Sequence, residues 1–126
     1  MRAPETLASL ATQHHPAHLL VLRADVTAPD EVRDALRAAL AAFGRVDVVF
    51  SGAVVATAGE VEGVPEESAR AAFEVNFWGA ARVAMEAVRV FRENRPRGGR
   101  LIVNCGAAET AGRAVNGWCC ASKHGE

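Results

Sequence analysis

The feature that most constrains the fold is an alternation of short apolar runs with segments of helical periodicity. Three apolar runs predict strands, and they lie at 18–24, 46–50 and 100–105. A short continuous run of this kind indicates a strand buried on both faces, as in a parallel sheet. Because strands that alternate with helices favour a parallel sheet, we predict a three-layer α/β fold with about three strands and helices on both faces.

Segments of helical pattern flank these runs. The clearest is 27–43, where one apolar stripe is formed by Val32, Leu36, Leu40 and Phe43. Thr27 and Asp30 are spaced to cap its first turn, and Gly44 is placed to end it in a left-handed turn. The other helices are predicted over 4–13, over 65–92 as one long or two joined helices, and from 118 onward.

Length and composition limit the class of protein. The 126 residues suit one domain, 1–126, and 50% of them are hydrophobic. The net charge of −1 gives no general attraction to nucleic acid or to an anionic membrane. No apolar run is long enough to span a membrane. Three cysteines, two of them adjacent, indicate a reducing, cytoplasmic environment instead of a disulfide framework.

The carboxyl ends of the predicted strands are the expected place for a ligand. In open parallel sheets, ligands bind in the crevice beyond these ends. The residues there are Asp25, 51–54 and 104–107. This expectation follows from the strand pattern alone.

Five phrases, taken in order, resemble the short-chain dehydrogenase/reductase family. They are Arg23 to Thr27 (RADVT), Phe43 to Val49 (FGRVDVV), Phe73 to Gly79 (FEVNFWG), Gly99 to Asn104 (GRLIVN) and Ala121 to Lys123 (ASK). Each phrase is weak alone, but their order and spacing cover nearly the whole chain. The resemblance implies a partial, Rossmann-like NAD(P)-binding domain, truncated at both ends. Members of this family transfer hydride between a nicotinamide and an alcohol or carbonyl substrate.

The resemblance implies roles in catalysis and in binding of NAD or NADP. Lys123 matches the lysine that binds the nicotinamide ribose, and Asn76 matches the asparagine whose backbone holds a water in the proton relay. Asp25 matches the acid that borders the adenine pocket. The remaining cofactor-binding candidates are matched by position only, and they are Arg2, Val26, Ser51, Gly52 and Ala53.

Departures from the family pattern predict impaired chemistry. The glycine-rich phosphate loop belongs to a strand–helix turn that this sequence lacks. Cys119 stands at the position of the catalytic tyrosine and Gly106 at that of the serine, and the chain has no tyrosine at all. The only hydroxyl between Asn104 and Ser122 is Thr110. Because loss of one general acid costs about 10²–10⁴ in rate, we expect this chain to be inactive or nearly so.

Three functional hypotheses remain open. The first is an impaired NAD(P)-dependent oxidoreductase for a small alcohol or carbonyl compound. The second is a non-catalytic remnant that associates with other subunits through the 65–92 helix, which also makes a homo-oligomer plausible. The third is a gene-model fragment without a function of its own. In the family sheet two strands lie between the 18–24 and 46–50 strands, so we expect these two to pair directly here.

Several side chains also have ordinary structural explanations. Lys123 is either catalytic or a solvated lysine, and Asp25 either contacts adenine or caps the next turn. Asn76 indicates a helix kink with a polar purpose, the alternative being a surface asparagine. Phe73, Phe77 and Trp78 are expected in the core, as are Val75, Val83, Val88 and Phe91. No metal site is predicted, because Cys119, Cys120 and His124 lack the usual ligand spacing.

Overall fold

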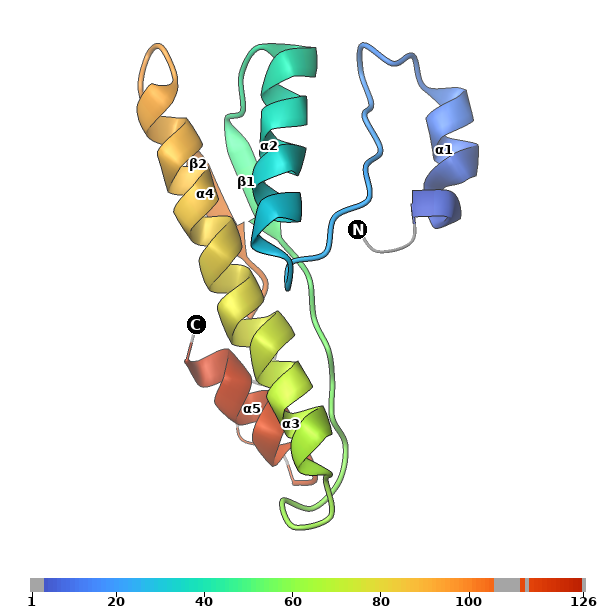
Figure 1. Cartoon of the computed structure of the whole chain (residues 1–126), viewed down its shortest axis with the longest axis vertical. Helices are drawn as coiled ribbons and strands as arrows, with labels where there is room; N and C mark the ends of the chain where they lie inside the picture. Colours follow the sequence, from blue (N-terminus) through green and yellow to red (C-terminus); the bar gives the residue numbers. More distant parts are fainter. Residues whose placement is uncertain (1–3, 106–111, 113, 126) are drawn as a thin grey trace.

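The structure is a computed structural model that describes residues 4–105, 112 and 114–125. Its elements are η1 (Pro4–Leu7), α1 (Ala8–Gln13), α2 (Pro29–Phe43), β1 (Val48–Ser51), α3 (Glu66–Phe73), η2 (Glu74–Gly79), α4 (Ala80–Glu93), β2 (Arg100–Val103) and α5 (Gly117–His124). Figure 1 shows α2 beside α4, and α5 beside α3 at the other end of the long helix. The predicted α/β class with a parallel sheet is confirmed, while the domain limits 1–126 stay a prediction.

The sheet consists of β1 and β2, which pair in parallel with Val48 opposite Arg100 and Ser51 opposite Val103. Side chains alternate between its two faces. The face that carries Val49 and Leu101 packs against helices, whereas Val48 on the other face is exposed. The sheet is therefore covered on one side by the elements that the structure describes.

The core lies between this covered face and the helices α2 and α4. Val49 of β1, with Ala87 and Phe91 of α4, forms the buried cluster. Leu36 of α2 packs against it together with the partly buried side chains of Val46, Val83 and Leu101. Burial of these apolar side chains stabilises the packing, at about 25 cal/mol for each Å² removed from water.

The strand predicted at 18–24 is not formed. This segment is extended but belongs to no sheet, and it does not pair with β1 as expected. Its apolar side chains are half-buried at Leu19, Val21 and Leu22 and exposed at Leu20. Figure 1 shows the segment standing apart from β1. The apolar run signals a need for burial, but the part of the chain that the structure describes supplies no strand beside it.

The entry into α2 differs from the predicted capping box. Its N-cap is Ala28, which makes no side-chain cap. Instead, Asp25 Oδ1 accepts hydrogen bonds from the Thr27 backbone N–H at 3.0 Å and from Thr27 Oγ1 at 2.8 Å. The expectation that Asp25 caps this turn is confirmed. Gly44 ends the helix with a φ of 74° and donates its N–H to the Leu40 carbonyl, as predicted.

The 65–92 region is one continuous helix made of α3, η2 and α4, and η2 has π geometry. Val75 and Phe91 are buried as predicted. Trp78 and Val88 are exposed, so their assignment to the core was wrong. The π segment shifts the helix register, which a search for regular 3.6-residue periodicity does not detect. Among the described residues, no helix combines the length and apolar character needed to cross a bilayer.

Candidate active site

Asn76 lies within η2, and its side chain is fully buried, at 0% exposure. Oδ1 accepts a hydrogen bond from the Val55 N–H at 2.8 Å. Nδ2 donates to the Val55 carbonyl and to Ser122 Oγ, both at 2.9 Å. The expected helix distortion with a polar purpose is confirmed. This one amide ties η2 to the loop after β1 and to α5.

Ser122 is a buried polar residue that the sequence analysis did not single out. Its hydroxyl donates to the Cys119 carbonyl at 2.8 Å and accepts from Asn76 Nδ2 at 2.9 Å. A serine inside a helix commonly bonds back to the preceding turn, which leaves its oxygen able to accept from elsewhere. The only sequence signal was its position directly before Lys123 in a phrase typical of the family.

Lys123 extends from α5 toward the carboxyl end of β2. Its Nζ donates to the Asn104 carbonyl at 3.0 Å, and the residue is only 4% exposed. The alternative of a solvated lysine is therefore wrong. A buried ammonium requires compensating hydrogen bonds, because removing a charge from water is costly. The structure thus holds a cation at one of the strand ends where ligands of parallel sheets bind.

A buried thiol lies at the position that the sequence analysis matched to the family's catalytic tyrosine. Cys119 lies one helical turn before Lys123, and both Cys119 and its neighbour Cys120 are buried and free. A phenol oxygen reaches roughly 4 Å farther from the backbone than a thiol sulfur, whereas proton transfer needs contacts of about 2.6–3.2 Å. The site can hold a cation and a hydrogen-bond network, but it has no phenol to pass a proton. Among the described residues, no three His, Cys, Asp or Glu side chains form a metal-binding group.

A cavity of about 460 Å³ lies at the carboxyl end of β1. It is lined by small and branched apolar residues, namely Ala24, Val26, Gly52, Ala53, Val54, Val55 and Val75. Three of the predicted cofactor-binding residues, Val26, Gly52 and Ala53, are therefore brought together. Small side chains allow a planar or bulky ligand to approach the backbone closely, so the lining fits part of a nucleotide.

Val26, which lines this cavity, is held in place by η2 and α4 of the long helix. A Cβ added at Gly79 would lie 2.6 Å from Val26 Cγ2, so only glycine allows this approach. Arg82 donates to the Val26 carbonyl at 3.3 Å and forms an ion pair with Glu74 at 2.6 Å. The end of η2 thus positions one side of the cavity.

Other predicted site residues are not at the cavity surface or lie outside the described part. The carboxylate of Asp25 bonds to the following turn, and its backbone N–H donates to Glu31 Oε2 at 2.9 Å. Ser51 is buried at the end of β1. Arg2 and Gly106 lie outside the described residues.

A wider apolar groove of about 930 Å³ lies between α3 and the start of α5, away from the strand ends. Phe73, Trp78 and Trp118 are among its lining residues. Its charged side chains form ion pairs, Arg70 with Glu66 at 2.7 Å and Glu74 with Arg82 of α4 at 2.6 Å. The groove offers apolar surface without convergent catalytic groups, so we assign the chemistry to the strand ends and not to this groove.

The sequence is similar to a family model and to known oxidoreductases. The model of a family described as enoyl-(acyl carrier protein) reductase matches residues 1–125. The oxidoreductase calM of Penicillium decumbens is 38% identical over 106 residues, which cover 82% of this chain and 34% of calM. The uncharacterized oxidoreductase C162.03 of Schizosaccharomyces pombe is 38% identical over 80% of this chain and 32% of its own length. The chain spans about a third of the length of these relatives.

Solved structures are similar over almost the entire chain. A short-chain dehydrogenase from Streptomyces avermitilis superposes with a TM-score of 0.87 at 26% identity, over 99% of this chain and 45% of that one. A short-chain dehydrogenase/reductase from Burkholderia phymatum in complex with NAD gives 0.85 at 23% identity, over 96% of this chain and 42% of that one. Together with the match over residues 1–125, these similarities show that the chain belongs to the short-chain dehydrogenase/reductase family of oxidoreductases.

Proposed function

We propose that the chain forms part of an NAD(P)-dependent oxidoreductase site for an alcohol or carbonyl compound, and that its own proton transfer is impaired. The observation that carries this proposal is the buried Lys123 ammonium, bonded to the Asn104 carbonyl at 3.0 Å. It stands at a strand end, where parallel sheets bind ligands. The NAD bound to the Burkholderia phymatum protein, and the 5-hydroxy-NADP bound to an alcohol dehydrogenase from Thermococcus sibiricus, support a nicotinamide cofactor.

The two ends of the site have different parts in this proposal. The cavity beside Gly52 and Ala53 takes the adenine end of the cofactor, because its walls are apolar and closely approachable. Lys123 orients the nicotinamide ribose through hydrogen bonds, and Asn76 with Ser122 fixes α5 relative to the loop after β1. A bound nicotinamide supplies hydride-transfer chemistry, while the residues of this chain bind and orient it. Cys119 and Cys120, which are buried and form no disulfide, support a reducing, cytoplasmic setting.

Binding is tested by titrating the isotope-labelled chain with NADPH and following backbone amide shifts. Shifts should cluster at Val26, Gly52 and Ala53 and at the start of α5. Lys123→Met should remove the shifts in α5 and leave those at the cavity, since it deletes the ammonium but keeps the length of the side chain. Because a millimolar dissociation constant corresponds to about 4 kcal/mol, even weak binding is detectable in this titration. No shifts at either end at about 10 mM NADPH would refute the proposed cofactor site.

The impaired proton transfer is tested separately at Cys119. Cys119→Tyr should raise the rate of NADPH-dependent reduction of a simple carbonyl compound by about 10²-fold or more, because a general acid typically contributes 10²–10⁴. Cys119→Ala is the control, and it should match the unmodified chain if the thiol takes no part. An unmodified chain that reacts as fast as the tyrosine variant would contradict the proposal.

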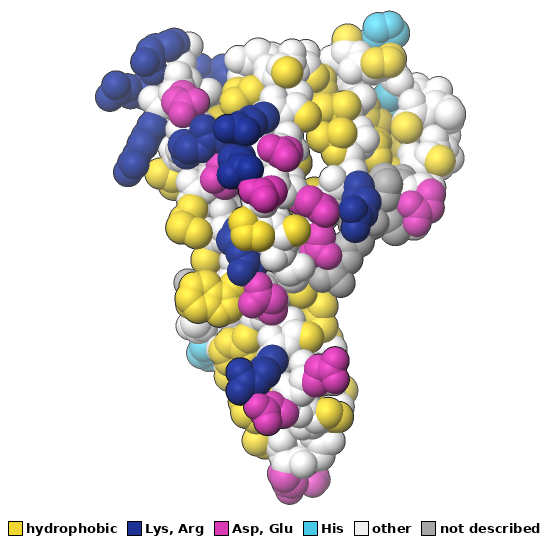
Figure 2. Space-filling model, viewed as in Figure 1, with side chains coloured by type: hydrophobic (Ala, Val, Ile, Leu, Met, Phe, Trp, Pro, Cys, Tyr) yellow, Lys and Arg dark blue, Asp and Glu magenta, His cyan; other side chains and the backbone are white. Residues whose placement is uncertain are grey.

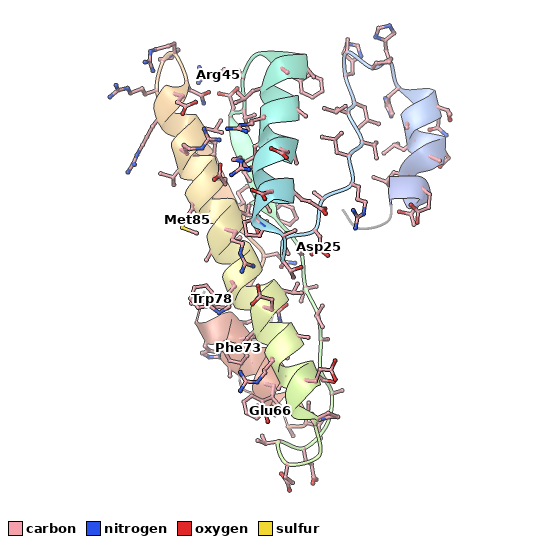
Figure 3. The ribbon with its side chains drawn as sticks, in the orientation of Figure 1. Asp25, Arg45, Glu66, Phe73, Trp78 and Met85 are labelled. Atoms are coloured by element: carbon pink, nitrogen blue, oxygen red, sulfur yellow. The ribbon has the colours of Figure 1, made fainter. Side chains whose placement is uncertain are left out.

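A second proposal concerns self-association through the 65–92 helix. Trp78 and Met85 project from the same side of this helix (Figure 3), and both are large, apolar and exposed. Val88 continues the exposed apolar surface one turn further along α4. Apolar side chains that gather on one helix face commonly mark an interface, which supports a homodimer built on this surface.

Sedimentation analysis tests this interface with a pair of matched variants. Met85→Lys should convert the dimer to a monomer, because it places a charge in the apolar contact. Phe50→Lys should leave the dimer intact, since Phe50 lies on the sheet and is exposed to the same extent, 64%. A chain that is monomeric at high concentration, or a dimer that resists Met85→Lys, would rule out this interface.

A further inference from the structure

The turn between α4 and β2 is held in place by backbone hydrogen bonds and by one buried side chain. Asn94, which is only 6% exposed, donates through Nδ2 to the Val46 carbonyl at 2.9 Å and to the Gly98 carbonyl at 2.7 Å. The Gly98 N–H in turn donates to the Phe91 carbonyl at 2.9 Å. These bonds join the turn to the end of α4 and to the segment before β1, so its side chains project from a fixed backbone.

Four arginines lie on or beside this turn, and we call them the arginine cluster: Arg92, Arg95, Arg97 and Arg100. All four are exposed. Arg95 Nη1 donates to backbone carbonyls at the end of α4, among them the Asn94 carbonyl at 2.9 Å. Within the part of the chain that the structure describes, no carboxylate forms an ion pair with any of the four. The cluster therefore presents positive charge that the chain itself does not neutralise.

The other arginines of the described residues are all paired with a carboxylate. The ion pairs are Arg23 with Glu31, Arg33 with Asp30, Arg37 with Asp34, Arg45 with Asp47, Arg70 with Glu66, Arg82 with Glu74, and Arg89 with Glu86 and Glu93. Figure 2 shows Lys and Arg side chains gathered at the upper left of the molecule, where α4 ends in Figure 1. Because the whole chain has a net charge of −1, this surplus of positive charge is local.

The arginine cluster lies away from the candidate active site. Arg100 is the first residue of β2, whereas the Asn104 carbonyl that binds Lys123 follows the carboxyl end of this strand. The length of the strand, at about 3.3 Å for each residue, therefore separates the two places. A partner bound at the cluster would leave the candidate active site open, so this binding is independent of the proposed function.

The surroundings of the arginine cluster decide which anion fits it. Guanidinium groups bind carboxylates and phosphates alike through paired hydrogen bonds. Residues 92–100 contain no aromatic side chain on which a nucleic-acid base could stack. The exposed carboxylates of Glu93 and Asp47 border the cluster and would repel a polyanion that extends beyond it. We propose that the arginine cluster binds a short acidic segment of a partner protein.

The test titrates the isotope-labelled chain with hexaglutamate at low ionic strength and without cofactor. Amide shifts should appear at 97–100 and saturate with a dissociation constant of about 0.1–1 mM, since each exposed ion pair contributes little. The affinity should fall at least about fivefold when salt is raised to about 0.15 M, where the Debye length is about 8 Å. Absence of binding, or shifts that lie away from 97–100, would overturn the inference. So would tighter binding of a thymidine hexanucleotide, because the cluster would then prefer phosphates.

A triple variant removes the cluster while keeping the backbone of the turn. Its substitutions are Arg92→Gln, Arg97→Gln and Arg100→Gln. Arg95 stays in place, because its guanidinium group bonds to the end of α4. The triple variant should bind hexaglutamate at least about tenfold more weakly than the unmodified chain.

A second triple variant removes the same charge from elsewhere on the surface. Its substitutions are Arg23→Gln, Arg37→Gln and Arg70→Gln, at exposed arginines that carboxylates already neutralise. The affinity for hexaglutamate should change by less than about threefold. Equal losses in the two triple variants would overturn the inference, because overall charge and not the cluster would then attract the peptide. The shifts in the unmodified chain locate the binding site independently of how either variant folds.

Discussion

The buried amide of Asn76 gives the most quantitative test of the candidate site. Asn76→Ala removes three hydrogen bonds and leaves the Val55 N–H and C=O groups without that partner. An unsatisfied buried backbone group costs about 1–3 kcal/mol, and Val55 is only part-buried, so the lower half of this range applies. Together the two groups and the loss of packing should lower the free energy of unfolding by about 2–4 kcal/mol.

Urea denaturation followed by circular dichroism measures this loss. With a slope of about 2 kcal/mol per molar urea, the midpoint should fall by roughly 1–2 M at unchanged slope. The same change should speed hydrogen exchange in the loop after β1, because that loop is held by Asn76. A loss of this size is a large share of the roughly 5–15 kcal/mol that stabilises a typical domain.

Two further substitutions test whether the loss of stability comes from the hydrogen bonds of Asn76 or would follow from any substitution in this helix. Asn94→Ala removes the buried asparagine that directly follows α4, whose side chain donates to the Val46 and Gly98 carbonyls at 2.9 and 2.7 Å. Asn94→Ala should lower the free energy of unfolding by less than Asn76→Ala does, since no buried N–H loses its acceptor. Ser122→Ala combined with Asn76→Ala should reveal a coupling energy of about 0.5–1.5 kcal/mol. A cost of Asn76→Ala below about 0.5 kcal/mol, or no greater than that of Asn94→Ala, would refute the reasoning.

Three other predictions are tested by unfolding, the first two with urea and the third by heating at a series of pH values. Gly79→Ala should lower the free energy of unfolding by about 1–3 kcal/mol, because the added methyl group overlaps Val26. Adding Val26→Ala to the same chain should restore part of this loss. If nothing is restored, the steric cause is excluded. Asp25→Ala should cost about 0.5–2 kcal/mol by removing the turn cap, whereas Asp25→Asn should cost little because Oδ1 still accepts. The hydrogen bond with Glu86 raises the pKa of Arg89 in the folded chain. The resulting contribution to folding stability is present below the pKa that Arg89 has in the unfolded chain, and it is lost only at strongly alkaline pH. Arg89→Gln should therefore leave the shape of the Tm profile between about pH 6 and 10 unchanged.

The sequence predicted the helices well because helix signals are local. The apolar stripe and the terminal glycine lie within or next to the helix that they define. The stripe from Val32 to Phe43 and the terminal glycine Gly44 define α2 almost to the residue. The predicted capping of this helix by Thr27 was wrong because Asp25, two residues earlier, accepts hydrogen bonds from both donor groups of that threonine. Such competition between neighbouring polar side chains depends on the path of the backbone, which sequence spacing alone does not give.

The extended segment shows the limit of an apolar run as evidence. Leu19 to Leu22 predicts a buried strand, yet a strand exists only where another backbone lies beside it. The long-range hydrogen-bond partners at the candidate site could not be predicted from the sequence either. Asn76 could be identified as an anomaly in a helix, but its partners Val55 and Ser122 lie 21 and 46 residues away. Those pairings depend on the packing of the whole chain.

The π segment in the long helix has a consequence for how this protein is aligned with others. A π turn closes its hydrogen bonds over five residues instead of four, so residues 74–79 take in one residue more than an unbroken α-helix of the same length. Because the bulge absorbs the extra residue, deleting a single residue there would restore an unbroken α-helix with α3 and α4 close to their present orientation, but the local backbone that presents Asn76 to Val55 and Ser122 would be lost. A one-residue gap in this stretch of an alignment therefore marks a relative in which the asparagine network has been dismantled, even if every other residue is the same.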